Sequence, residues 1–313
     1  MRTRKLGEVE VSAIGLGAMP LSIEGRPDRE RALATIHAAL DAGVTLIDTA
    51  DSYHWHPDEV GHNEELLAGL KGVLIATKGG RGRPGDGSWT VDASPEHLKR
   101  ACEGSLRRLR VDVIDLYQLH KPDPAVPFED SLGALAELHA EGKIRAIGLS
   151  NVDTAQILRA RELLGPTVVS VQNEFSPRVR TSEPELRLCA ELGIAFLPWS
   201  PLGGISRSSL DGPSELAGDT EFHRVARDLG VSPQRVCLAW LLSLSPTVIP
   251  IPGASRPESI RDSAAAWELG WGSGPDETIG DQEHRPVWTG GSGGGGLRHP
   301  GEARGGDGNG QTR

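Results

Sequence analysis

Cysteine is scarce in this sequence, and basic residues are fewer than acidic ones. The three cysteines, Cys102, Cys189 and Cys237, lie far apart and form no CxxC pair, so the sequence predicts neither a disulfide framework nor a cysteine zinc site. The 33 Lys and Arg residues are outnumbered by 43 Asp and Glu residues, which gives a net charge of -10. Because this charge repels phosphate backbones and anionic lipid surfaces, we expect a small-molecule partner rather than nucleic acid or a membrane.

Long apolar segments are missing as well. No apolar run approaches the roughly 18 residues that span a bilayer, and residues 1–17 contain no apolar stretch of signal-peptide length. We therefore expect a cytoplasmic protein in a reducing compartment. With 313 residues and 37% hydrophobic residues, the chain suits one large α/β domain or two ordinary ones.

The composition changes sharply near the C-terminus. Residues 271–313 hold 14 of the 40 glycines but only three aliphatic residues, too few to offset the chain entropy of ordering the segment. We expect this segment to be a disordered, glycine-rich tail. Residues 1–270 are expected to form a single folded domain.

Short apolar runs alternate with amphipathic stretches through residues 1–270, a pattern typical of βα units. Eight strands are predicted, at residues 13–17, 45–48, 73–77, 113–119, 144–149, 168–172, 194–199 and 247–251. Helices are predicted to begin after Asp28, Ser94 and Asp153, whose side chains can cap a first turn. This order predicts the α/β class and a (β/α)8 TIM barrel, with residues 3–12 as a hairpin that closes its floor. Several of the helices are predicted to end at a glycine, namely at Gly43, Gly165, Gly193 and Gly230.

Four chemically useful side chains follow the predicted strands, where a barrel places its active site. These are Asp48, Tyr53, Lys78 and His120. Together they can protonate a carbonyl oxygen. A free phenol has a pKa near ~10, and the ammonium of Lys78 is expected to lower the pKa of Tyr53 while Asp48 keeps Lys78 charged. His120 is expected to orient the carbonyl oxygen by a hydrogen bond.

No side chain delivers hydride, so this chemistry requires a reduced cofactor. Ser150, Asn151 and Gln172 offer groups that can hydrogen-bond a nicotinamide carboxamide, and Trp199 offers a flat face for its ring. The last predicted strand runs into a glycine-containing turn and a helix, where a phosphate can bind. This turn includes Ile251, Gly253, Ser255 and Arg256.

Seven sequence blocks together resemble the aldo-keto reductase superfamily. They lie at residues 47–53, 76–80, 115–123, 141–151, 171–176, 198–204 and 251–259, and the resemblance extends from about residue 4 to residue 267. It implies a (β/α)8 barrel that uses NADPH or NADH to reduce aldehydes or ketones reversibly. It also implies Tyr53 as the general acid, supported by Asp48, Lys78 and His120. The implied cofactor residues are Ser150, Asn151, Gln172 and Trp199 at the nicotinamide, and Ser200, Leu202 and Gly203 along the pyrophosphate.

The sequence departs from this family pattern at two places. Many members carry lysine, serine and arginine where this chain has Gly253, Ala254 and Ser259, so Arg256 is the remaining cation expected to favour NADPH over NADH. Asp262 and Ser263 match the usual adenine positions. The resemblance ends near Trp267, before the helix and pocket segment with which members usually end. A more open site or a destabilised last barrel helix is the hypothesis that follows.

The substrate pocket is expected to include Met19, His54 and Trp55. The spacing of His54, His56 and His62 can in principle meet a metal, but a pocket wall fits this loop better, and no metal is expected. An NADP-dependent carbonyl reductase is the favoured function. Two alternatives stay open: a cofactor-binding regulatory module resembling potassium-channel β-subunits, and a reductase impaired by its altered C-terminus. The sequence predicts neither the natural substrate nor the oligomeric state.

Overall fold

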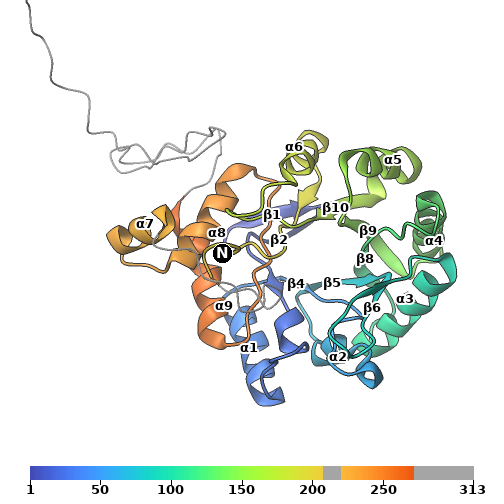
Figure 1. Ribbon diagram of the computed structural model, residues 1–313, viewed down its shortest axis with the longest axis horizontal. Coiled ribbons are helices and arrows are strands. Elements are labelled where there is room, and N and C mark those ends of the chain that lie inside the picture. Colours follow the sequence, from blue (N-terminus) through green and yellow to red (C-terminus); the bar gives the residue numbers. More distant parts are fainter. Residues whose placement is uncertain (207–219, 271–313) are drawn as a thin grey trace, which may run out of the picture.

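Parallel strands form the centre of the molecule. The computed structural model describes residues 1–206 and 220–270, which are the basis of all that follows. One sheet has the strand order β11-β10-β9-β8-β5-β4-β3, and it curls so that helices surround it (Figure 1). Its strands are β3 (Leu16–Gly17), β4 (Leu46–Asp48), β5 (Leu74–Gly79), β8 (Ile114–Leu119), β9 (Ile144–Ser150), β10 (Val168–Gln172) and β11 (Ala195–Phe196). The predicted barrel class is confirmed.

The eighth predicted strand, residues 247–251, is not a regular strand. Pro250 and Pro252 have no backbone N–H, so the segment cannot donate a full ladder. It still takes the eighth place, because Ile249 N–H donates to the Phe196 carbonyl (2.8 Å) and Gly15 N–H donates to the Pro250 carbonyl (2.9 Å). Single parallel bridges, Phe196 to Val248 and Gly17 to Gly253, complete the contact on both sides. The barrel therefore closes through a proline-containing segment between β11 and β3.

The helices begin where the sequence predicted. Asp28, Ser94 and Asp153 each accept a hydrogen bond from a backbone N–H of the first turn of α1, α3 and α5. Gly193 and Gly230 follow α6 and α7 in the left-handed conformation, with φ of 66° for each. The helices are α1 (Arg29–Asp41), α2 (His62–Leu66), α3 (Pro95–Leu109), α4 (Phe128–Ala140), α5 (Thr154–Leu164), α6 (Glu183–Leu192), α7 (Glu221–Leu229), α8 (Pro233–Leu244) and α9 (Pro257–Ala264). Short 3-10 turns lie at η1 (Met19–Leu21), η2 (Pro57–Glu59), η3 (Gly165–Thr167) and η4 (Ala265–Leu269).

Two antiparallel hairpins lie outside the main sheet. The first, β1 (Thr3–Leu6) with β2 (Val9–Ser12), is the predicted floor hairpin, and its Leu6 and Val11 pack against apolar residues of the barrel interior. The second, β6 (Arg81–Gly82) with β7 (Thr90–Val91), follows β5 and was not predicted. No helix in residues 1–206 or 220–270 is long and apolar enough to cross a membrane. The predicted tail at 271–313 lies outside the described residues.

Candidate active site

A pocket of about 420 Å³ opens where the barrel strands end, a size typical of small-molecule sites. It collects side chains that lie far apart in the sequence. Those that the sequence predicted and that line the pocket are Met19, Asp48, Tyr53, His120, Ser150, Asn151, Gln172, Trp199, Ser200, Leu202, Ile251 and Gly253. The strand ends therefore meet as the barrel prediction required.

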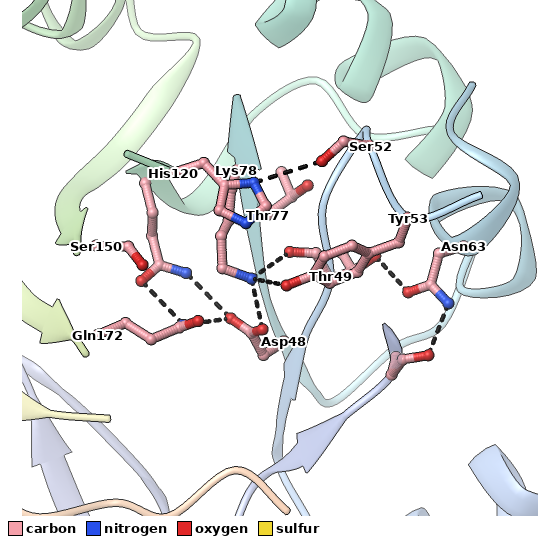
Figure 2. Close-up of polar contacts among 12 residues, drawn as sticks. Asp48, Thr49, Ser52, Tyr53, Asn63, Thr77, Lys78, His120, Ser150 and Gln172 are labelled. Atoms are coloured by element: carbon pink, nitrogen blue, oxygen red, sulfur yellow. Dashed lines mark hydrogen bonds and ion pairs between the residues drawn. The ribbon is translucent and has the colours of Figure 1, made fainter. Parts of the chain in front are cut away.

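Lys78 connects the proposed acid to its charge partner (Figure 2). Its ammonium donates to Asp48 Oδ1 (2.5 Å), to the Tyr53 hydroxyl (2.9 Å) and to the Thr49 carbonyl (2.9 Å). These bonds use all three donors of the ammonium. Lys78 is fully buried, so its charge depends on these partners rather than on water.

Asp48 also accepts hydrogen bonds on its second carboxylate oxygen. The amide nitrogens of Gln118 (3.1 Å) and Gln172 (2.7 Å) both donate to Oδ2. Gln172 was predicted as a nicotinamide ligand, yet its amide nitrogen is engaged here. Gln118 was not predicted at all. The signal that could have found it is the strand period, because Gln118 lies two residues after Leu116, which faces the barrel interior.

The pKa of Tyr53 is the first correction to the sequence analysis. We expected Lys78 to lower it, but burial raises the pKa of this phenol by more than the ammonium lowers it. Burial also opposes the charge on Lys78, and there Asp48 and Tyr53 prevail and raise the pKa of the lysine. Tyr53 therefore holds its proton and Lys78 holds its charge at neutral pH.

His120 lies beside this pair at the end of β8. Its ring centroid is 5.7 Å from that of Tyr53, and the two rings meet edge to face. Burial, and then the charges of Lys78 and Arg81, hold the pKa of His120 well below its usual range. A neutral imidazole at this place has one N–H to donate to a substrate oxygen.

The substrate side of the pocket is the second correction. Met19 lines the pocket, but His54 turns away and its Nδ1 bonds the His56 carbonyl (2.7 Å), while Trp55 stacks on the His56 ring at 5.1 Å. The two side chains that follow Tyr53 in the sequence thus do not line the pocket as Tyr53 does. The pocket wall is instead formed by three residues that were not predicted, Pro20, Arg81 and Trp89. The glycine-rich loop after Lys78 was the available signal, because functional groups gather on βα loops.

The histidines of this loop do not converge. His62 Nδ1 lies 2.8 Å from the Ser22 hydroxyl, away from the His54 contact. Among the described residues, no group of three or more His, Cys, Asp or Glu side chains is arranged to hold a metal ion.

The other side of the pocket has features that fit a flat, polar ring. Ser150, Asn151 and Trp199 line it, and within the described part of the chain the buried Trp199 Nε1 has no hydrogen-bond partner. Asn151 has a φ of 58°, a left-handed conformation that few residues besides glycine and asparagine adopt and that clusters at functional sites. A Cβ on Gly17 would lie 2.7 Å from the Ile251 carbonyl oxygen, so only glycine fits at this wall. These residues fit a bound nicotinamide.

Four predicted cofactor residues do not line the pocket. Gly203 lies next to Ser176, where an added Cβ would be 2.7 Å from the hydroxyl. Ser255 and Arg256 precede α9, and Arg256 Nη2 is 3.4 Å from the Ser259 hydroxyl. Asp262 is paired with Arg235 of α8 at 2.8 Å, so its carboxylate holds two helices together in this structure.

Comparison with known proteins decides the family. The model of the Aldo/keto reductase family matches residues 13–271. The chain belongs to this family. Membership confirms the resemblance seen in the sequence, the barrel fold and the class of reaction, the NAD(P)H-dependent reduction of aldehydes or ketones.

Two curated proteins and one solved structure are similar to this chain over most of its length. An uncharacterized oxidoreductase of Schizosaccharomyces pombe is 38% identical over 84% of this chain and 84% of its own. Pyridoxine 4-dehydrogenase of Escherichia coli is 36% identical over 85% of this chain and 93% of its own. The structure of an aldo-keto reductase from Klebsiella pneumoniae in complex with NADPH has a TM-score of 0.70 and 30% identity, covering 85% of this chain and 89% of that one.

Proposed function

We propose that this aldo/keto reductase uses NADPH to reduce an aldehyde or ketone, with Tyr53 as the acid that protonates the carbonyl oxygen. The observation that carries the proposal is the hydrogen-bonded series Asp48, Lys78 and Tyr53, buried at the wall of a pocket that also exposes His120. Residues 1–270 are proposed as the reductase domain, and the family match over residues 13–271 supports this.

The cofactor fits on the side of Ser150, Asn151 and Trp199, and when bound it supplies hydride to the carbonyl carbon. The electron pair of the C=O bond then moves to the oxygen, which lies between the Tyr53 hydroxyl and the His120 ring. Tyr53 gives its proton to this oxygen, and the product is an alcohol.

The residues around Tyr53 keep its phenol protonated before the reaction and stabilise the phenolate afterwards. Burial keeps the phenol protonated until it is needed. The Lys78 ammonium, 2.9 Å away, stabilises the phenolate that forms when the proton leaves. Asp48 makes this possible because its carboxylate keeps the buried Lys78 charged. His120, being neutral, can donate to the substrate oxygen without adding a further positive charge beside Lys78 and Arg81.

NADPH is preferred over NADH in this proposal. Arg256 is the guanidinium at the turn after the eighth barrel segment. Among the described residues its side chain donates to the Ser259 hydroxyl (3.4 Å), which leaves most of its donors for a phosphate. The NADPH bound to the Klebsiella pneumoniae relative supports the same choice.

The experiment compares the wild type with Tyr53→Phe, following NADPH oxidation with aromatic, aliphatic and dicarbonyl substrates. Removal of a general acid should lower kcat by roughly 10² to 10⁴-fold, because the phenyl ring has no proton to give. Quenching of tryptophan fluorescence by NADPH should be alike in both proteins. Equal turnover by both proteins would refute the role of Tyr53, and cofactor binding without any turnover would point to a binding module.

A further inference from the structure

Arg81 places a positive charge in the pocket beside the reacting groups. Its Cζ lies 4.7 Å from the centre of the Trp89 ring, and that ring lies 6.3 Å from Tyr53 and 6.2 Å from His120. Trp89 thus forms a wall shared by the arginine and the proposed acid. All four residues line the same pocket.

Apart from its contact with the Trp89 ring, the guanidinium of Arg81 has no hydrogen-bond or ion-pair partner among the described residues. Its buried Nε donates no hydrogen bond, and neither of its other two nitrogens makes a hydrogen bond or ion pair within residues 1–206 and 220–270. Arg83 provides the contrast. It lies two residues along the same hairpin and over the same Trp89 ring (4.5 Å), but it is paired with Glu24 at 2.5 Å. The hairpin therefore carries one neutralised arginine and one whose charge is available.

The net charge of the pocket also favours an anionic ligand. Among its described lining residues, Asp48 and Arg81 are the ionised groups, and Asp48 is neutralised by Lys78. The pocket thus has a net positive charge in a protein whose overall charge is -10. An unpaired cation in a partly buried place is costly unless an anion reaches it. Arginine suits a carboxylate, because its planar fork donates two parallel hydrogen bonds.

We propose that the substrates of this enzyme are carbonyl compounds that carry a carboxylate, and that Arg81 binds this carboxylate while the carbonyl lies between Tyr53 and His120. The inference rests on the proposed function and narrows its substrate class. Arg81 is then a specificity residue: it contacts the substrate away from the carbon that accepts hydride. Trp89 holds its guanidinium at the wall through the cation–π contact.

The test compares 4-carboxybenzaldehyde with its methyl ester, which differ in charge but present similar aldehydes. The quantity measured is the ratio of kcat/KM for the two, which does not depend on how much of a variant is folded. The wild type should prefer the carboxylate. Arg81→Gln should lower the ratio by about 10- to 100-fold, the range of a charge-assisted hydrogen bond, and Arg81→Lys should keep part of it.

Two control variants separate this effect from others. Arg83→Gln removes the neighbouring cation that Glu24 already neutralises, so it should leave the ratio as in the wild type. Tyr53→Phe should lower turnover of both aldehydes together. A wild type that does not distinguish acid from ester, or a ratio that Arg81→Gln leaves unchanged, would overturn the proposal.

A binding measurement decides the matter even if no aldehyde is reduced. With NADP⁺ present, terephthalate and its monomethyl ester are titrated against tryptophan fluorescence. Both offer one carboxylate to the position between Tyr53 and His120, but only terephthalate has a second one for Arg81. Tighter binding of terephthalate in the wild type, lost in Arg81→Gln, supports the proposal whatever the turnover. Equal affinities of the two compounds in the wild type refute it.

Discussion

Replacing Asp48 by asparagine tests whether this carboxylate holds the charge on Lys78. The substitution keeps the shape of the side chain but removes the negative charge that lies 2.5 Å from the ammonium. In the wild type, burial lowers the pKa of Lys78, but Asp48 and Tyr53 outweigh burial and raise it. Without Asp48, burial should prevail, and Lys78 should be neutral in the folded variant.

The stability of the wild type and that of the Asp48→Asn variant should therefore depend differently on pH. In the wild type, the stabilisation that protonated Lys78 gives the folded state is fully present below its unfolded pKa near ~10.4. It is lost as the pH rises through the still higher pKa of the folded state. In the variant, the unfolded chain binds a proton that the folded chain lacks, so stability rises by about 1.4 kcal/mol per pH unit below the unfolded pKa. Between about pH 7 and about pH 9.5, the stability gap should therefore shrink by up to about 3 kcal/mol.

Urea unfolding at a series of pH values measures this gap. Near neutral pH it should be about 3–5 kcal/mol in favour of the wild type, as expected when a buried ion pair loses one partner. Asp228→Asn is the matched control, because it removes a carboxylate that pairs with Arg224 on the exposed face of α7 and leaves the pair of Asp48 with Lys78 intact. A gap between wild type and Asp48→Asn that stays constant with pH would mean that Lys78 keeps its charge without Asp48, which would refute the reasoning.

Two further predictions concern the cofactor side. Gly17→Ala should destabilise the protein by about 1–3 kcal/mol and weaken NADPH binding, because the new Cβ would lie 2.7 Å from the Ile251 carbonyl oxygen. Thermal melts and fluorescence titration check this against Gly133→Ala, a helical site with open space around it; an equal response of the two variants would contradict it. Arg256→Ala should raise KM for NADPH by about 10-fold without a matching rise for NADH, and an equal effect on both cofactors would exclude Arg256 as the ligand that favours NADPH.

The sequence predicted the barrel because its signals are local. A cap such as Asp28 and the alternation of apolar runs depend on neighbours within a few residues. The eighth segment was predicted in the right place, but its pairing was not, because Pro250 and Pro252 limit which backbone groups can donate. Strand position follows from hydrophobicity, whereas strand regularity follows from the available N–H groups.

The wrong predictions at the site concern the orientation of side chains rather than their position along the chain. His54 and Trp55 follow Tyr53 directly, yet the chain turns and their side chains contact His56 instead of the pocket. Arg81 and Trp89 reach the pocket only because a hairpin after β5 folds back over the barrel mouth. Such a return depends on long-range contacts, which a sequence pattern does not contain. The predicted direction of the Tyr53 pKa shift was wrong for a related reason, since the burial that raises this pKa depends on the folded structure.

The polar layer of the barrel was nevertheless within reach of the sequence. Leu46, Ala76 and Leu116 form part of the apolar interior, and two residues further along the same strands stand Asp48, Lys78 and Gln118. Side chains two apart share a face, so one apolar layer and one polar layer follow directly from the strand period. Gly148 gives the same information from the neighbouring strand: it pairs with Gln118, and a Cβ there would lie 2.7 Å from the Gln118 side chain. A glycine inside an apolar strand therefore marked the space that a large polar neighbour needs, and with it the second amide that fixes Asp48.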